Sequence, residues 1–152
     1  MDLERVAAMH VESIRRSCKG HYTQAQIEAW TGALQPSVYE PALTDKCFIV
    51  ALNRKDVIGL GIMSVNDRKI SAVYVHPDHC GKGIGGRILA ELEHMAASEN
   101  IAEITAYATL NAKGFYLKNK YKEYEPAVHS LPNGLQLECI EMRKHITRAT
   151  DR

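Results

Sequence analysis

The sequence predicts one α/β domain, residues 1–152, in which helices flank a mixed, mostly antiparallel sheet with a parallel strand pair. Three observations predict it. Residues 2–31 have helical periodicity, and three apolar segments between residues 46 and 75 are joined by short turns. A glycine-rich loop and an amphipathic helix then link two further strands. A chain of 152 residues fits one domain of this kind.

Two helices are expected at the start. The segment 2–19 places these positions at three- and four-residue spacing: Leu3, Val6, Ala7, His10, Val11 and Ile14. Thr23 and Gln26 fit a capping box that begins a second helix, which ends near residue 31. The two prolines at positions 36 and 41 then predict a loop.

Three strands follow, over residues 46–52, 57–64 and 70–75. They are apolar and rich in β-branched residues, and their connections are too short for crossovers, so we expect an antiparallel meander. Gly59 and Gly61 inside the second strand predict a bulge or the close approach of a ligand.

A helical period then replaces the strand pattern. One face of a helix that lasts to about residue 98 carries Ile84, Ile88, Leu92 and Met95. A strand over 102–108 follows it. A right-handed crossover makes this strand parallel to the strand over 70–75.

The remaining elements complete the sheet. A short helix is expected over 111–119, and two closing strands over 121–127 and 135–142. The last ten residues, 143–152, hold four Lys/Arg and one Asp, and are expected to form a solvated tail.

Composition narrows the class of protein. The net charge is +1, weaker than the basic bias typical of a general nucleic-acid binder, so no nucleic-acid partner is expected. No apolar run approaches the roughly 20 residues of a membrane helix, so no membrane partner is expected. Residues 1–5 lack the charged and apolar segments of a signal peptide, which favours a cytoplasmic protein.

The four cysteines are scattered, at Cys18, Cys47, Cys80 and Cys139. None forms a CxxC pair and no Cys/His spacing matches a zinc site, so no metal is expected. In a cytoplasmic protein we expect reduced thiols.

The stretch from Val73 to Arg87 carries the candidate site. A strand ends at Val75, and the loop Gly81–Gly86 holds four glycines, so the backbone can approach a ligand closely. The first amides of the following helix have no internal acceptor and, with the helix dipole, form an anion site. Lys82 and Arg87 add positive charge.

Other interpretations of this loop are an ordinary tight turn or another nucleotide site. A Walker loop needs Gly-Lys-Ser/Thr, but Lys82 is followed by Gly83. A dinucleotide fold expects an early glycine fingerprint and more strand–helix units than this chain supplies.

The segment resembles the acyl-coenzyme A motif of the GCN5-related N-acetyltransferase (GNAT) superfamily, in which Val-x-Pro ends a strand before Arg/Gln-x-x-Gly-x-Gly/Ala. The residues 75–77 and 83–85 match this pattern, while Cys80 stands where Arg or Gln is usual. A second family motif, Asn-x-x-Ala-x-x-Phe-Tyr, is similar to the stretch from Asn111, with matches at Phe115 and Tyr116.

The resemblance covers nearly the whole chain in element order, except at its start. Members of the family usually open with a strand, whereas this chain opens with a helix. Either that strand is absent, or another element covers that edge of the sheet.

The resemblance implies acetyl-coenzyme A as cosubstrate and an arm of the cofactor that pairs with the strand before the loop. The implied cofactor-binding residues are Val73, Val75, Cys80, Gly81, Lys82, Gly83, Ile84, Gly85, Gly86 and Asn111. Asn111 has a second interpretation, as the cap of the helix that begins there.

Tyr116 is the candidate catalytic residue, because the family places its general acid there and a tyrosine is protonated at neutral pH. The alternative is a packing role beside Phe115. The general base is unidentified, with His76, His79 and a water chain as candidates. Cys80 as an acetyl-carrying nucleophile lacks a partner base nearby in the sequence.

Tyr22, Trp30 and Tyr39 fall in the region that walls the acceptor pocket in the family, or are ordinary core aromatics. The function expected is direct transfer of acetyl to a primary amine in a ternary complex. A small-molecule acceptor is favoured because no peptide-binding extension is evident. Alternatives are a protein lysine or N-terminal acetyltransferase, a non-catalytic acyl-coenzyme A sensor and a nucleotide-binding regulator. A homodimer is left open.

Overall fold

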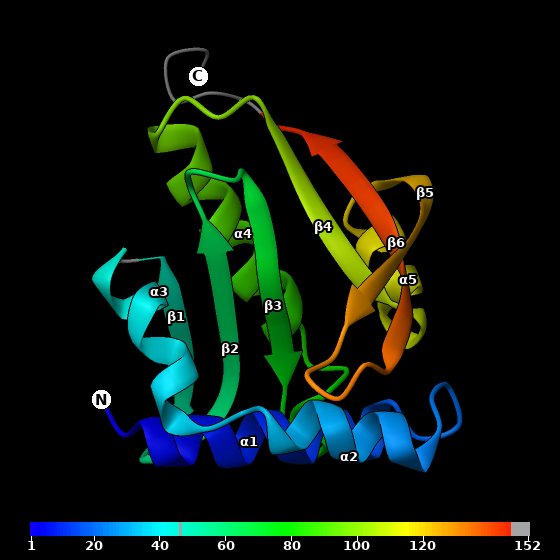
Figure 1. The fold of residues 1–152 in the computed structure, drawn as a ribbon. Helices are drawn as coiled ribbons and strands as arrows, with labels where there is room; N and C mark the ends of the chain where they lie inside the picture. The colour runs from blue at the N-terminus through cyan, green and yellow to red at the C-terminus, as the bar shows by residue number, and fades with distance from the viewer. Residues whose placement is uncertain (46, 147–152) are drawn as a thin grey trace.

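A computed structural model, which describes residues 1–45 and 47–146, shows one six-stranded sheet with helices on both faces (Figure 1). The strand order is β1-β2-β3-β4-β6-β5. The strands are β1 (Phe48–Asn53), β2 (Asp56–Ser64), β3 (Lys69–Val75), β4 (Glu103–Thr109), β5 (Lys122–Ser130) and β6 (Gln136–His145). Only β3 and β4 are parallel, and all other pairs are antiparallel. The predicted fold class is confirmed.

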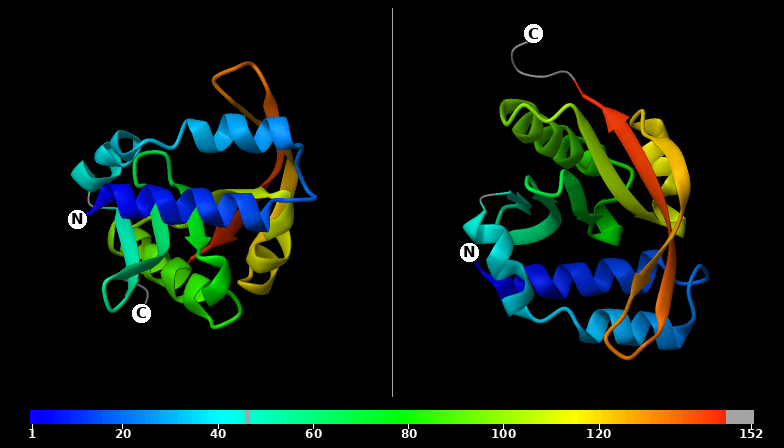
Figure 2. Two further views of the ribbon diagram at one scale, coloured as in Figure 1. Left: turned by 90° about the horizontal axis from the view of Figure 1, so that it is seen from below. Right: turned by 45° about the horizontal axis from the view of Figure 1, so that its top comes forward.

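Helices α1 (Leu3–Ser17) and α2 (Gln24–Gly32) cover one face, and α4 (Ile84–Ser98) and α5 (Lys113–Lys118) lie on the other (Figures 1 and 2). Asp2 caps α1 by accepting a bond from the Arg5 N–H. The capping box at α2 is present, since Thr23 N–H donates to Gln26 Oε1 at 2.8 Å and Gln26 N–H donates to Thr23 Oγ1 at 3.1 Å.

The loop expected around the two prolines is wrong. This segment forms a 3-10 helix, η1 (Pro36–Tyr39), followed directly by α3 (Glu40–Thr44). Both prolines lie in the first turn of a helix, where the missing N–H has no intrahelical acceptor to lose.

The two faces of the sheet have separate cores. Leu89 and Leu92 of α4 pack with Ile104 and Met142 on one face. On the other, α1 packs with β2 and β3, and α2 packs with the β5–β6 hairpin. The hairpin tip therefore lies on α2, and also receives a bond from Gln26 Nε2 to the Gln136 carbonyl.

At Gly59 and Gly61 the group that approaches the strand closely is helix α4, and not a ligand. A Cβ at Gly61 would lie 2.4 Å from Ile88 Cγ2, and one at Gly59 would lie 2.9 Å from Ile88 Cδ1. The register of β1 against β2 also shifts beside Gly59, so the predicted bulge is present. The glycines bring α4 against the backbone of β2.

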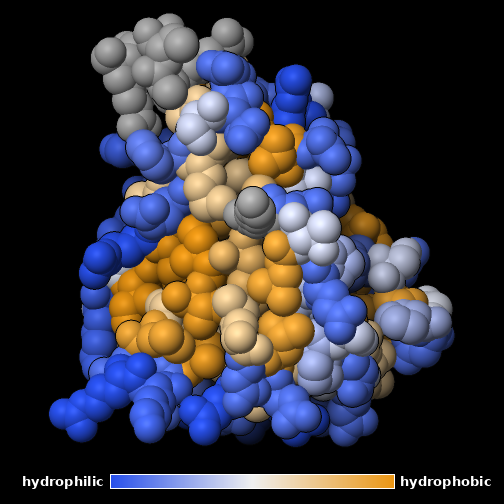
Figure 3. Space-filling model, turned by 90° about the vertical axis from the view of Figure 1, so that its left-hand side faces the viewer, coloured by the Kyte–Doolittle hydropathy of each residue, from blue (hydrophilic) through white to orange (hydrophobic). Residues whose placement is uncertain are grey.

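The ends of the sheet differ from expectation in two ways. Strand β6 runs to His145, so the first three residues of the expected tail belong to the sheet, and residues 147–152 lie outside the described part. No strand precedes β1 among the described residues, so β1 is the edge strand. Figure 3 shows an apolar surface on this side, where Leu52 is 61% exposed. Lys46, where the first strand was expected to begin, is not described.

Candidate functional site

The central feature of the site is a gap between the parallel strands β3 and β4. The two strands pair only at Lys69 with Thr105 and at Ile70 with Ala106. The register of β3 against β2 shifts beside Ile70 and leaves Ser71 without a partner in β2, as in a β-bulge. A bulge bends its strand, and β3 diverges from β4 beyond this point (Figure 1). The sheet therefore opens where β3 approaches the glycine-rich loop.

The peptide groups of Val73 and Val75 face this gap. The His76 N–H donates to the Ile58 carbonyl at 2.7 Å, and in an antiparallel pair only alternate residues bond to a given neighbour. Val73 and Val75 therefore point their peptide groups away from β2. The Val75 carbonyl accepts a bond from Ser13 Oγ of α1 at 3.0 Å. The Val73 groups and the Val75 N–H have no ladder partner in β4.

The N-terminus of α4 lies next to the end of β3. Gly81 and Gly83 have φ of +78° and +81°, a conformation that favours glycine. The Arg87 N–H donates to the Gly83 carbonyl at 3.1 Å as the first bond of the helix. The three amides of residues 84–86 thus have no acceptor within the helix, and no side chain caps it. This is the geometry of an anion site.

A cavity of about 670 Å³ joins the gap to this helix N-terminus. Ten of the predicted site residues line it: Val73, Val75, Cys80, Gly81, Gly83, Ile84, Gly85, Gly86, Asn111 and Tyr116. Lys82 and Arg87 are exposed and do not line it. Lys118 of α5 and His21 lie in the wall instead. We call this space the first cavity.

Tyr116 lies in α5 and is buried, while still lining the first cavity. Burial raises its pKa well above the usual value for tyrosine, so the hydroxyl stays protonated throughout the neutral range. Its ring packs edge-to-face on Phe115 and Tyr121. Phe115 in turn approaches Gly85, where a Cβ would lie 3.1 Å from Phe115 Cε1. The packing role and the site position therefore coexist.

Asn111 does not cap a helix. It lies inside a 3-10 turn, η3 (Leu110–Ala112), and α5 begins after Ala112 with no side-chain cap. Its Oδ1 accepts a bond from the buried Cys18 thiol at 3.4 Å. The capping interpretation is wrong, because the turn moves the start of α5 to Lys113.

The base candidates near the loop differ in position. His79 lines the first cavity, whereas His76 accepts a bond from the Asp78 N–H through Nδ1. The Cys80 thiol is exposed, and its described partners are the carbonyls of Val75 and His76. No base therefore contacts this thiol in the described part of the chain.

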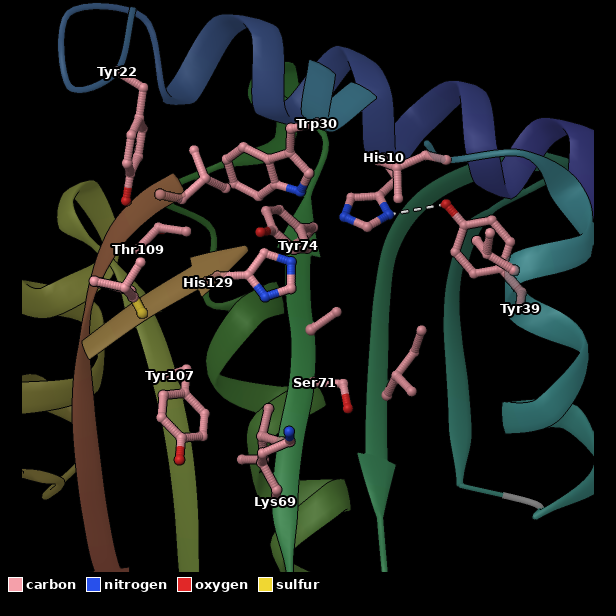
Figure 4. Close-up of a pocket in the computed structure, with 18 residues that line it drawn as sticks. His10, Tyr22, Trp30, Tyr39, Lys69, Ser71, Tyr74, Tyr107, Thr109 and His129 are labelled. Carbon is pink, nitrogen blue, oxygen red and sulfur yellow. Dashed lines mark hydrogen bonds between the residues drawn. The ribbon is translucent and has the colours of Figure 1, made fainter. Parts of the chain in front are cut away.

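A second cavity, of about 530 Å³, lies on the face of the sheet covered by α1 and α2 (Figure 4). The two cavities share wall residues at the gap: Ile70, Ser71, Ala72, Tyr74, Tyr107 and Thr109. Tyr22, Trp30 and Tyr39 all line the second cavity while also belonging to the core. A ligand in each cavity would meet the other through the split sheet.

His10 contributes an unusual group to the second cavity. It is 5% exposed, and burial lowers its pKa to about 4, so the ring is neutral at physiological pH. Its Nδ1 shares a hydrogen bond of 2.9 Å with the Tyr39 hydroxyl. Its Nε2 is buried and has no partner among the described residues, and the ring packs on Tyr74 with centroids 4.3 Å apart. In Figure 4 this nitrogen points toward the middle of the cavity.

Several wall residues had no signal specific enough to find them. Ser13 and Ser17 of α1 reach the first cavity, and Lys69 reaches the second. In the sequence, Ser13 and Ser17 are small polar residues on a largely apolar helix, and Lys69 is a lysine at the start of a strand. Neither pattern by itself indicates a binding site. Within residues 1–45 and 47–146 we find no group of three His, Cys, Asp or Glu suited to a metal ion.

Comparison with known proteins gives a family and several similar folds. A family model described as an acetyltransferase (GNAT) domain matches residues 18–144. No curated protein matches the chain. No helix in the described part is long and apolar enough to cross a membrane.

Among solved structures, a GCN5-related N-acetyltransferase from Rhodopseudomonas palustris, also described as a class-II aminotransferase, is 27% identical with a TM-score of 0.87, over 95% of this chain and 90% of that chain. The paia N-acetyltransferase of Thermoplasma acidophilum, in complex with coenzyme A, is 22% identical with a TM-score of 0.70, over 95% and 92% of the two chains. The ribosomal-protein-S18-alanine N-acetyltransferase of Escherichia coli is 14% identical with a TM-score of 0.63, over 98% and 92%. The last two likenesses concern the fold.

Proposed function

The chain belongs to the GNAT acetyltransferase family, and from this premise we propose that it transfers acetyl from acetyl-coenzyme A to a primary amine of a small molecule. One observation carries the proposal. The Val73 peptide groups and the Val75 N–H, which have no partner in β4, and the three amides of residues 84–86, which have no acceptor within the helix, open on one cavity. An extended pantetheine arm needs the first set, and a diphosphate needs the second.

The proposed reaction takes place where the two cavities meet. The neutral amine, in the second cavity, attacks the thioester carbonyl; a C–N bond forms and the C–S bond breaks. The Val73 or Val75 N–H can stabilise the oxyanion that develops. Tyr116 gives its proton to the departing thiolate, and the proton that the nitrogen loses returns through water to the Tyr116 oxygen, so that the products are the amide and the free thiol.

Two features support a small acceptor. The second cavity, at about 530 Å³, has the size of a small-molecule site, and the tip of the β5–β6 hairpin closes one side of it against α2. Acetylation of a protein amine is the competing outcome.

A cytoplasmic location, the lack of a nucleic-acid partner and the oligomeric state stay predictions.

The proposed diphosphate site at the N-terminus of α4 is tested with Gly83→Asp. The substitution strains a backbone with φ of +81° and places a carboxylate at the helix N-terminus. We expect acetyl-coenzyme A to bind at least tenfold more weakly by calorimetry. Gly134→Asp is the matched control, because Gly134 has φ of +84°, equally open surroundings and a position outside both cavities.

If a folded Gly83→Asp protein bound acetyl-coenzyme A as tightly as the parent, the proposed diphosphate site would be refuted. A thiol-release assay over a panel of amines tests turnover separately. A protein that binds acetyl-coenzyme A and releases no thiol with any amine is a sensor.

A further inference from the structure

We infer that the acceptor, given the proposed function on which this inference rests, is an acidic aromatic amine: an amine with a carboxylate and a ring that bears a hydrogen-bonding substituent. The inference comes from the chemistry of the second cavity. Three properties of the cavity wall support the inference: its aromatic surface, its positive charge and one buried polar atom without a partner.

The wall is aromatic and apolar at the end nearest α1 and α2. Trp30 and Tyr74 pack edge-to-face with centroids 6.4 Å apart, and Leu34 packs in the same cluster. A planar ring suits such a wall, because aromatic pairs prefer edge-to-face or offset contacts and bury large apolar areas. We therefore place the apolar body of the acceptor there.

The charge of the wall is positive. No carboxylate lines the second cavity among the described residues, and Lys69 is the wall's one residue of fixed charge. Its Nζ lies over the Tyr107 ring, 5.3 Å from the centroid, and has no described ion pair. Glu141, which does not line the cavity, receives a bond from the Tyr107 hydroxyl at 3.2 Å and pairs with Arg143 at 2.6 Å.

This charge pattern disfavours a polycation and favours an anion. A polyamine or aminoglycoside needs acidic residues around its extra ammonium groups, and like charges without them are destabilising. Lys69 stands at the start of β3, opposite the aromatic end in Figure 4, with the gap between them. A carboxylate at Lys69 and a ring at Trp30 leave the amine near Ser71, where the two cavities meet.

The polar substituent follows from His10. Its buried Nε2 faces the cavity without a described partner, and a buried polar atom left unpaired is destabilising. A hydroxyl on the ring of the acceptor supplies that partner, as donor or acceptor, while the Tyr39 hydroxyl holds the other nitrogen at 2.9 Å.

The test measures thiol release with L-tyrosine, L-phenylalanine, their amides, tyramine and spermidine. We expect kcat/KM for each acid to exceed that for its amide at least tenfold. Lys69→Met should bring this ratio close to one by lowering kcat/KM for the acids, whereas Lys122→Met, at an exposed lysine of β5, should leave the ratio intact. L-tyrosine should exceed L-phenylalanine severalfold, and His10→Phe should erase that preference.

Each other outcome has a defined meaning. Faster transfer to spermidine or to the amides, or an unchanged acid-to-amide ratio in Lys69→Met, overturns the substrate class and leaves the acetyltransferase proposal standing. Equal rates with L-tyrosine and L-phenylalanine overturn the role of His10. Binding of acetyl-coenzyme A without thiol release from any amine overturns both the substrate class and the proposed function.

Discussion

The contact between α4 and β2 gives a prediction with a magnitude that follows from the structure. In Gly61→Ala the new Cβ would lie 2.4 Å from Ile88 Cγ2 and 3.1 Å from Leu92 Cδ1, about 1 Å inside an ordinary contact for the first pair. Cγ2 is attached to the Cβ of a branched residue, so it cannot rotate away without a change of rotamer. The helix must therefore move outward.

The expected cost has two parts. Overpacking a core costs about 1–3 kcal/mol, and replacing glycine by alanine in a strand returns roughly 0.5–1 kcal/mol. We expect a net loss of about 1–2 kcal/mol, which lowers Tm by roughly 2–8 °C in a chain of this size. Because α4 also carries the amides of residues 84–86, the affinity for acetyl-coenzyme A should fall as well.

The assay is thermal and urea unfolding of single and double variants. In Gly59→Ala the clash is with Ile88 Cδ1 at 2.9 Å, the flexible end of the side chain, so the loss should be smaller. Ile88→Val deletes Cδ1 and keeps Cγ2, so it should relieve Gly59→Ala and leave Gly61→Ala unrelieved. Relief of both variants alike, or a Gly61→Ala protein as stable as the parent, would refute the packing argument.

Two further predictions concern side chains of the cavities. Tyr116→Phe should reduce kcat by about 10²–10⁴-fold in a thiol-release assay, with unchanged affinity for acetyl-coenzyme A, and unchanged turnover would remove Tyr116 from the mechanism. The pKa of His10 is lowered from 6.5 to about 4, so the unfolded chain binds a proton that the folded protein excludes between these values. Stability should therefore fall as pH drops through this window, by about 3 kcal/mol in total, and His10→Leu should flatten the profile of unfolding free energy against pH. An equally steep profile in that variant would show that another group is responsible.

Much of the fold was predictable because it depends on local patterns. The apolar strands, the helical period around Ile88 and the capping box of Thr23 and Gln26 each have a signal within a few residues. The two prolines led to the wrong prediction of a loop, because proline disrupts a helix when it lies in the interior but is favoured in the first turn. The last strand was predicted too short, because Arg143 and Lys144 look like a charged tail. Instead both belong to β6, where Arg143 pairs with Glu141 of the same strand and Lys144 pairs with Glu93 of α4.

The candidate site was partly predictable. Its glycine-rich loop is continuous in the sequence, so the positions from Cys80 to Gly86 could be predicted as a group, and all of them except Lys82 line the first cavity. The bulge at Ser71 was not, because register depends on the partner strand. The second cavity was foreseen only as a set of aromatics. Its polar members, His10 and Lys69, are 59 positions apart and meet only once α1 packs against β3.

The short pairing between β3 and β4 has a mechanical meaning. The strands β1–β3 and β4–β6 form two half-sheets, joined directly by the pairing of two residues from each side. A cofactor lying along β3 would fill the gap between β3 and β4 and would restrain the motion of the two half-sheets relative to each other. Hydrogen exchange at the Val73 and Val75 amides should slow when acetyl-coenzyme A is bound, and the rest of the junction between β3 and β4 should stiffen with them.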